Sequence, residues 1–251
     1  MLEVRGIKQI FGGVTALDDV SFTMHRGDIT GVIGPNGAGK TTLFNIITGI
    51  YTRTAGAVIL DDRDISNLPA ERLAGLGMVR TFQNIELFAK MTVLENVMVG
   101  LHSRSKCGML SCALRMPWAA AEERRIRSEA MGWLEFAGIA ELAQVEAGNL
   151  PFGKGRLLEL ARAMACEPRI LLMDEPAAGL NSQETLGLAK LIRAIRDKGV
   201  SVVLVEHDME LVMDICDRII VLNLGKKLAE GTPREIQENA EVISAYLGED
   251  L

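Results

Sequence analysis

The sequence predicts an α/β protein built around a mainly parallel β-sheet. Short apolar runs that are typical of buried strands alternate with segments whose apolar residues recur at helical spacing. A glycine-rich loop follows one predicted strand, and acidic residues or a histidine follow two others. Because ligands of open α/β sheets bind at the carboxyl ends of the strands, these polar segments are expected to form one site.

The predicted strands are short and mostly apolar. The later runs have almost no polar residues, which is typical of parallel strands covered on both faces. A helix is expected between the last two single strands, where leucine and isoleucine recur at helical spacing up to Gly199. The strand ranges are 20–24, 28–33, 58–60, 169–173 and 202–205, followed by a hairpin of 219–222 and 226–229.

The middle of the chain, from residue 92 to about 138, has no strand signal. Ile126, Ala130, Trp133 and Ala137 recur on one helical face, and Gly108 and Pro117 are expected to interrupt the helical segment. This pattern predicts a helical subdomain inserted into the α/β core. We expect the core to comprise residues 1–83 and 166–251, with an antiparallel β-subdomain, and the helical insert to span about 84–165.

The composition is that of a globular protein. Of the 251 residues, 48% are hydrophobic and 24% are charged, which excludes a mostly disordered chain. The 33 acidic and 27 basic residues give a net charge of −6, which argues against nucleic-acid binding by bulk charge. No apolar run reaches the roughly 18 residues of a membrane span, so a membrane role is expected only through a partner. The cysteines form no Cys-x-x-Cys pair and are expected to be reduced cytosolic thiols: Cys107, Cys112, Cys166 and Cys216.

The glycine-rich loop has the sequence of a P-loop, G-x-x-x-x-G-K-[ST], between a strand and a helix. Its glycines let several backbone N–H groups point inward around a phosphate, and the following helix adds its positive N-terminal end. Lys40 would place a cation on the β- and γ-phosphates, and Thr41 would supply an oxygen ligand for Mg²⁺. The predicted phosphate-binding residues are Gly34, Pro35, Asn36, Gly37, Ala38, Gly39, Lys40, Thr41 and Thr42.

Two acidic residues follow the apolar run that ends at Met173. Asp174 could hold the Mg²⁺ shell, and Glu175 could polarise the attacking water as a general base. Two acids before Pro176 could instead only begin a helix, but their pairing with a P-loop favours catalysis. His207 follows the next apolar run and could hydrogen-bond the γ-phosphate or hold the water, although a lone histidine is more often structural.

These motifs, together with Gln83 and the segment 150–165, occur in the order and spacing of the ATP-binding cassette (ABC) ATPases, which the chain resembles over essentially its whole length. It is most similar to the ATPase subunits of branched-chain amino-acid uptake systems. This narrower resemblance depends on residues 11–17, 79–83 with 91–97, and 230–233 with 245–248. It implies a P-loop NTPase core of the RecA type that hydrolyses ATP with Mg²⁺ as the motor of an importer, for branched-chain amino acids or a related small solute.

The resemblance also implies roles for particular residues. Phe11 would stack on the adenine beside Val14, and Gln83 would reach the Mg²⁺ and the water. Residues 178–181 would form a loop that crosses to a second ATPase chain, and residues of about 84–100 would receive a short helix of a membrane permease. The two ATPase chains would pair head-to-tail, as a homodimer or heterodimer, on the cytoplasmic face of the membrane. A solute-binding protein would act indirectly.

One segment departs from the family pattern. The signature usually reads Leu-Ser-Gly-Gly-Gln, but here residues 150–154 read Leu-Pro-Phe-Gly-Lys. Pro151 replaces the serine whose hydroxyl would bond the γ-phosphate, and it also lacks a backbone N–H. Phe152, Gly153 and Lys154 complete the segment, Lys154 could contribute charge, and the following helix is expected from residue 155.

Other classes of P-loop protein fit less well. A soluble ABC ATPase that acts on DNA, RNA or ribosomes is the main alternative, but such proteins usually carry a coiled-coil insert or two cassettes. A GTPase would need an Asn-Lys-x-Asp segment, which the sequence lacks. A kinase would need neither Gln83 nor His207.

Overall fold

The computed structural model describes residues 1–102 and 117–247, and these residues form two compact units. Unit 1 comprises residues 1–83, 169–178 and those from 185 onward, and unit 2 comprises residues 84–168 and 179–184. The predicted helix break at Gly108 and the predicted thiols of Cys107 and Cys112 lie outside the described residues.

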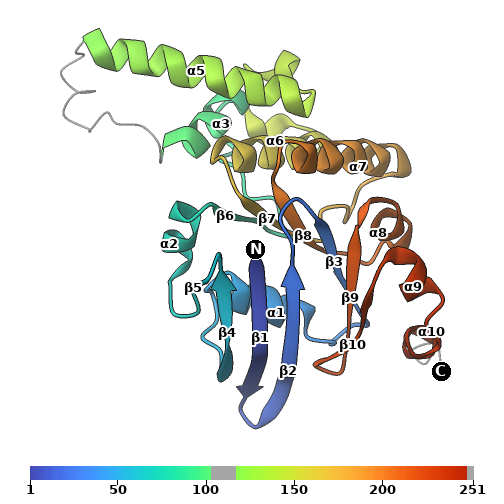
Figure 1. Cartoon of the computed structure of the whole chain (residues 1–251). Coiled ribbons are helices and arrows are strands. Elements are labelled where there is room, and N and C mark those ends of the chain that lie inside the picture. Colours follow the sequence, from blue (N-terminus) through green and yellow to red (C-terminus); the bar gives the residue numbers. More distant parts are fainter. Residues whose placement is uncertain (103–116, 248–251) are drawn as a thin grey trace. The chain divides into compact units, whose positions relative to one another are not determined.

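Unit 1 contains a six-stranded sheet in the order β10-β9-β3-β8-β7-β6 (Figure 1). The strands from β9 to β6 run parallel, whereas β10 pairs antiparallel with β9. Every residue of β7 and β8 is buried, which confirms the prediction that these two strands are covered on both faces, and β3 is buried in the same way. The strands are β3 (Ile29–Ile33), β6 (Met78–Thr81), β7 (Ile170–Asp174), β8 (Ser201–Val205), β9 (Arg218–Asn223) and β10 (Lys226–Gly231).

A second, antiparallel sheet of unit 1 has the order β2-β1-β4-β5, formed by β1 (Leu2–Phe11), β2 (Val14–Met24), β4 (Ala55–Leu60) and β5 (Arg63–Asp64). The sequence did not predict β1, and it predicted only the second half of β2. The register of β1 shifts between Val4 and Ile7, where Gly6 has a φ of 57°. The bulge brings both apolar residues to the buried face three positions apart, so the alternation expected of a strand is interrupted.

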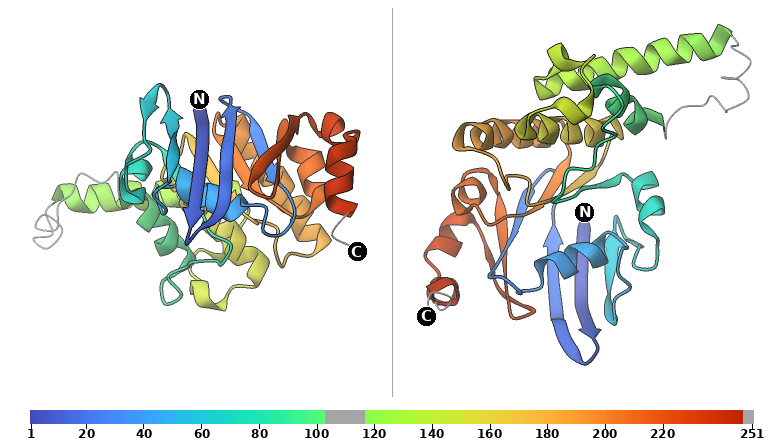
Figure 2. Two further views of the ribbon diagram at one scale, coloured as in Figure 1. Left: turned by 90° about the horizontal axis from the view of Figure 1, so that it is seen from below. Right: turned by 180° about the vertical axis from the view of Figure 1, so that it is seen from behind.

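The core of unit 1 draws residues from both sheets and from the helix α1 (Lys40–Ile47). Figure 2 shows α1 beside the strands β1 and β2. Leu43 and Phe44 of this helix are fully buried in that core, so packing fixes the position of the helix that follows the P-loop. The remaining helices of this unit are α2 (Ala70–Gly75), α8 (Met209–Ile215), α9 (Pro233–Gln237) and α10 (Ala240–Leu247); α7 (Ser182–Asp197) begins in unit 2 and continues in unit 1.

Unit 2 is helical, as the middle of the sequence predicted. It contains α3 (Val93–His102), α5 (Pro117–Ala137) and α6 (Phe152–Ala165), with two short 3₁₀ turns at Ala140–Leu142 and Ala147–Asn149. Ala130 and Ala137 of the predicted stripe are buried in a separate hydrophobic core. A Cβ at Gly100 of α3 would lie 2.5 Å from the carbonyl oxygen of Arg162, so glycine permits close packing of α3 on α6.

Candidate functional site

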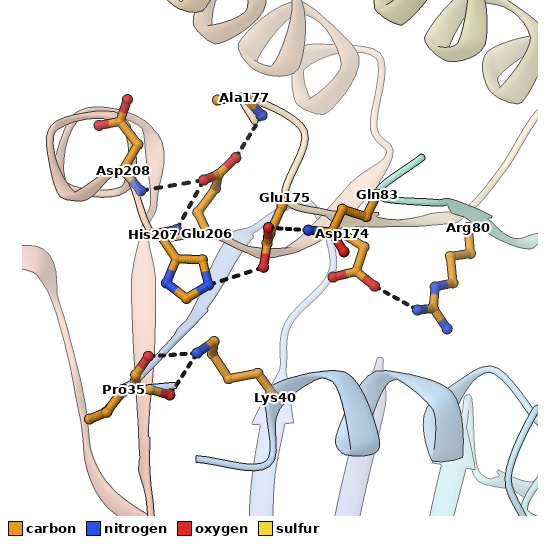
Figure 3. A network of polar contacts seen from close by, with 11 residues as sticks. Pro35, Lys40, Arg80, Gln83, Asp174, Glu175, Ala177, Glu206, His207 and Asp208 are labelled. Atoms are coloured by element: carbon orange, nitrogen blue, oxygen red, sulfur yellow. Dashed lines mark hydrogen bonds and ion pairs between the residues drawn. The ribbon is translucent and has the colours of Figure 1, made fainter. Parts of the chain in front are cut away.

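The P-loop joins β3 to α1 and requires glycine at its first position. Gly34 has a φ of 152°, and a Cβ there would lie 2.1 Å from the carbonyl oxygen of Leu222 on β9. Gly39 adopts a left-handed conformation directly before α1. The Lys40 ammonium donates hydrogen bonds to the carbonyl oxygens of Gly34 at 2.6 Å and Pro35 at 2.9 Å (Figure 3). The loop thus curls around the cation that the sequence predicted for phosphate binding.

Glu175 lies at the centre of a second group of polar side chains. Its Oε2 accepts a hydrogen bond from Nε2 of Gln83 at 2.7 Å, and its Oε1 lies 3.0 Å from Nε2 of His207. Three residues that are far apart in the sequence therefore meet just beyond the carboxyl ends of β6, β7 and β8. This is the edge of the parallel sheet at which the sequence placed them.

The backbone of Glu175 is held in an uncommon conformation. Its φ is 46°, which costs energy in any residue with a side chain. Its N–H donates to the carbonyl oxygen of Val205 at 2.9 Å, which extends the pairing of β7 with β8 by one residue. The side chains of Asp174 and Glu175 consequently point to different partners, although the residues are adjacent (Figure 3).

Asp174 forms a buried ion pair that the sequence did not predict. Its Oδ2 lies 2.7 Å from the guanidinium of Arg80, and both side chains are less than a tenth exposed. Arg80 also donates to Asn45 of α1 and to Thr48, the residue that follows this helix, and its guanidinium lies over the ring of Phe82, 5.0 Å from the ring centroid. The sequence offered one indication of this ion pair, a single arginine inside the short strand β6. A buried positive charge needs a negatively charged or polar partner.

Removing this guanidinium is expected to destabilise unit 1. Arg80→Leu leaves the buried carboxylate of Asp174 without its cation, which typically costs about 3–5 kcal/mol. Denaturant unfolding of this variant measures the loss. Arg80→Lys serves as the comparison, because it keeps one charge but not the bonds to both Asn45 and Thr48. A stability of Arg80→Leu equal to that of the wild type would contradict this account.

The predicted adenine contact lies in unit 1 at the turn between β1 and β2. Phe11 is 42% exposed and Val14 is 71% exposed, so both side chains are open to a ligand. The ring of Phe11 meets Tyr51 edge-on, with ring centroids 5.6 Å apart. An exposed aromatic ring held by a neighbour is suited to stacking on a flat base.

The signature segment lies in unit 2, and its helix begins earlier than expected. Pro151 is the N-cap of α6, so Phe152, Gly153 and Lys154 form its first turn and the predicted start at residue 155 was wrong. Proline suits a helix start, because the N–H that it lacks would have no partner inside the helix. The Lys154 ammonium, predicted to add charge near phosphate, lies 3.9 Å from Glu141.

The first turn of α6 contacts the predicted crossing loop within unit 2. A Cβ at Gly179, whose φ is 80°, would lie 3.0 Å from the ring of Phe152. A Cβ at Gly153 would meet the carboxylate of Glu184, which caps α7 together with Asn181. These two glycines therefore allow the signature segment and residues 179–184 to pack closely.

The donors near the P-loop fit a magnesium ion that also binds phosphate. Thr41, Gln83 and Asp174 offer oxygen atoms, which Mg²⁺ prefers. Residues 1–102 and 117–247 contain no cluster of three or more acidic, histidine or cysteine side chains that could hold a metal.

Glu206 is a second residue that the sequence analysis passed over. It is 3% exposed and accepts hydrogen bonds from backbone N–H groups in two segments near Glu175. The sequence did contain an indication of its importance, because this acid directly follows an apolar strand and directly precedes the candidate histidine.

Two known families match the chain. One, described as ABC transporter, matches residues 17–178, and the other, described as branched-chain amino acid ATP-binding cassette transporter, matches residues 226–251. The high-affinity branched-chain amino acid transport ATP-binding protein LivG of Salmonella typhimurium strain LT2 is 46% identical, over 99% of this chain and 98% of its own length. Among the described residues, none of the helices is long and apolar enough to cross a membrane.

Solved structures of cassettes share the fold. The ADP conformation of an ATP-binding cassette of an ABC transporter is 32% identical, with a TM-score of 0.86 over 99% of this chain and 98% of that chain. A dimeric post-hydrolysis structure of another cassette, bound to ADP and phosphate, is 26% identical, with a TM-score of 0.78 over 93% of this chain and 99% of that chain.

Proposed function

Because the chain belongs to the ABC transporter family of ATPases, we propose that it is the ATP-hydrolysing subunit of a complex that imports branched-chain amino acids. The observation that carries the substrate class is the similarity to LivG over nearly the whole of both chains, together with the family match at residues 226–251. The comparisons give no support for the alternative, an ATPase that acts on nucleic acid or ribosomes.

The proposed chemistry is attack of water on the γ-phosphorus of ATP, which breaks its bond to the bridging oxygen and releases ADP and phosphate. Residues 34–42 would hold the phosphates, with Lys40 as their cation. Glu175 would accept a proton from the water as general base, and its contacts with Gln83 and His207 support this role by fixing the direction of its carboxylate. His207 would then hydrogen-bond the γ-phosphate, and Phe11 and Val14 would contact the adenine.

Magnesium would be held by Thr41, Gln83 and Asp174, and when bound it would neutralise charge on the phosphates. The ion pair with Arg80 supports this assignment for Asp174, because it holds the carboxylate in a fixed position.

We further propose that two ATPase chains pair head-to-tail and bind membrane permease subunits at the cytoplasmic face. In this arrangement the signature residues Pro151, Phe152, Gly153 and Lys154 contact the ATP of the partner chain. The exposed ring of Phe88 and the side chain of Val99 support a permease contact at residues 84–100. The solute-binding protein would contact the permease subunits and not this chain.

If the second ATPase chain has an intact signature segment, the altered segment of this chain predicts that the two ATP sites of the pair differ in activity. Each signature serves the opposite P-loop, so the site built on Lys40 should be the more active of the two. Glu175→Gln is then expected to lower ATP hydrolysis of the complex more than the equivalent change in the partner chain. Steady-state hydrolysis by the two single variants tests this, and equal losses would reject the asymmetry.

The import function is tested by purifying the tagged full chain from membranes together with whatever binds it. We expect co-purification of permease subunits, identified by mass spectrometry, and ATP hydrolysis by the reconstituted complex that rises when leucine and a solute-binding protein are added. Lysine in place of leucine is the matched control. Hydrolysis that responds to neither amino acid would contradict the proposed substrate class, while leaving the ATPase assignment intact.

A further inference from the structure

Glu206 follows the last residue of β8 and directs its carboxylate into the protein. One oxygen, Oε1, accepts the backbone N–H of Ala177 at 2.7 Å. The other, Oε2, accepts the backbone N–H groups of His207 at 3.0 Å and Asp208 at 3.4 Å. The side chain thus connects the segment after β7 with the segment after β8 (Figure 3).

Keeping a carboxylate at this depth is costly. Burial raises the pKa of Glu206, and the hydrogen bonds from Ala177, His207 and Asp208 act in the opposite direction by stabilising the ionised form. The negative charge of Asp208 raises this pKa further. An apolar side chain at this position would avoid the cost of burying a charge, so the retained carboxylate calls for a role that needs its acceptors.

The two segments that Glu206 joins carry the side chains of the candidate site. Ala177 lies two residues after Glu175, and His207 is the residue next to Glu206. The Glu175 carboxylate and the His207 ring meet at 3.0 Å. We propose that Glu206 is a positioning residue for ATP hydrolysis, which holds the Glu175 and His207 segments at the separation that this contact requires. The inference rests on the roles proposed above for Glu175 and His207.

The sheet itself does not supply this constraint. The ladder between β7 and β8 ends with the pairing of Asp174 and Val205, and the N–H of Glu175 adds one more bond to Val205. Among the described residues, the hydrogen bond from the N–H of Ala177 to Glu206 links the segment 176–178 with the segment 206–208. Its loss would leave the strands intact and loosen the residues beyond them.

The test compares Glu206→Gln with Asp208→Ala in the full-length chain. The glutamine amide keeps the shape of the side chain but presents an NH₂ group to at least one backbone N–H, so one bond is replaced by a donor facing a donor. We expect kcat for ATP hydrolysis to fall about ten- to hundredfold, because small displacements of reacting groups have effects of this order. KM for ATP should stay within about twofold, since the P-loop is untouched.

Asp208→Ala controls for a general loss of stability in the same segment. Its side chain caps α8 by accepting from the N–H of Leu211 at 3.0 Å, so the variant destabilises α8 but keeps the Ala177–Glu206 bond. We expect its kcat to stay near that of the wild type. A kcat of Glu206→Gln equal to that of the wild type, or an equal loss in Asp208→Ala at the same melting temperature, would overturn the proposal.

A double-mutant cycle with Glu175→Gln separates this inference from the proposed function. If Glu206 acts through Glu175, the double variant should hydrolyse ATP no more slowly than Glu175→Gln alone. Additive losses would show that Glu206 acts elsewhere and would reject the positioning role. A normal rate in Glu175→Gln would instead reject the proposed general base itself.

Discussion

The Glu175→Gln variant is expected to bind ATP with nearly the affinity of the wild type but to hydrolyse it at least about a hundredfold more slowly. Glutamine has the same shape and can keep hydrogen bonds to Gln83 and His207, so the geometry around it should be retained. It cannot accept a proton from water, however. Binding and hydrolysis should therefore separate in this variant.

This variant is also expected to accumulate an ATP-bound dimer. Hydrolysis removes the γ-phosphate and with it the contacts that favour the closed pair, so blocking hydrolysis preserves them. Size-exclusion chromatography with light scattering in ATP measures the dimer, and a phosphate-release assay measures the rate. Glu71→Gln, at an exposed acid of α2, is the matched control and should behave as the wild type. An unaltered rate in Glu175→Gln would mean that another group accepts the proton.

The Lys40→Ala variant is expected to lose nucleotide affinity about ten- to hundredfold. A hydrogen bond to a charged group contributes about 1.5–3 kcal/mol to the free energy of binding, and each 1.4 kcal/mol corresponds to a factor of ten in the dissociation constant. The Lys40 ammonium donates to the carbonyl oxygens of Gly34 and Pro35, which holds it inside the loop where phosphate is expected. The variant therefore removes the cation of the loop, whereas the backbone N–H groups remain.

Isothermal titration calorimetry with ATP measures this loss. Lys190→Ala removes one positive charge from the exposed face of α7 and controls for the change in net charge. The melting temperature of Lys40→Ala should be measured alongside, because Lys40 is a buried residue of α1. Wild-type affinity in a folded Lys40→Ala protein would contradict the phosphate-binding role.

The sequence predicted the candidate site best where polar, chemically reactive residues directly follow an apolar strand. The P-loop between β3 and α1, the two acids at the end of β7 and the histidine after β8 were predicted close to where they lie, although β7 extends one residue further than predicted and includes Asp174. Apolar runs followed by polar residues are a strong local pattern. Whether Glu175 would meet His207 and Gln83 depended on strand order in the sheet. Local patterns do not encode that order, so the structure was needed to bring the three together.

Other features were missed for physical reasons. The strand β6 is four residues long and contains Arg80, whose charge breaks the apolar pattern and is satisfied by Asp174 from a distant part of the sequence. Glu206 was not singled out, because its partners are backbone N–H groups, which every residue except proline carries and which a sequence therefore does not reveal. In both cases the residue is explained by tertiary contacts alone.

The placement of unit 2 in the chain affects which residues can be exchanged together. β6 and β7 are paired neighbours in the sheet, yet nearly all of unit 2 is inserted between them, since the chain leaves unit 1 after Gln83 and returns at Arg169. A chimera that exchanges this insertion for that of a relative would retain the paired strands and the phosphate-binding loop. The residues proposed for the permease contact could therefore be exchanged without altering the P-loop, Glu175 or His207, whereas the signature residues 151–154 would be exchanged with them, because they lie in the same insertion.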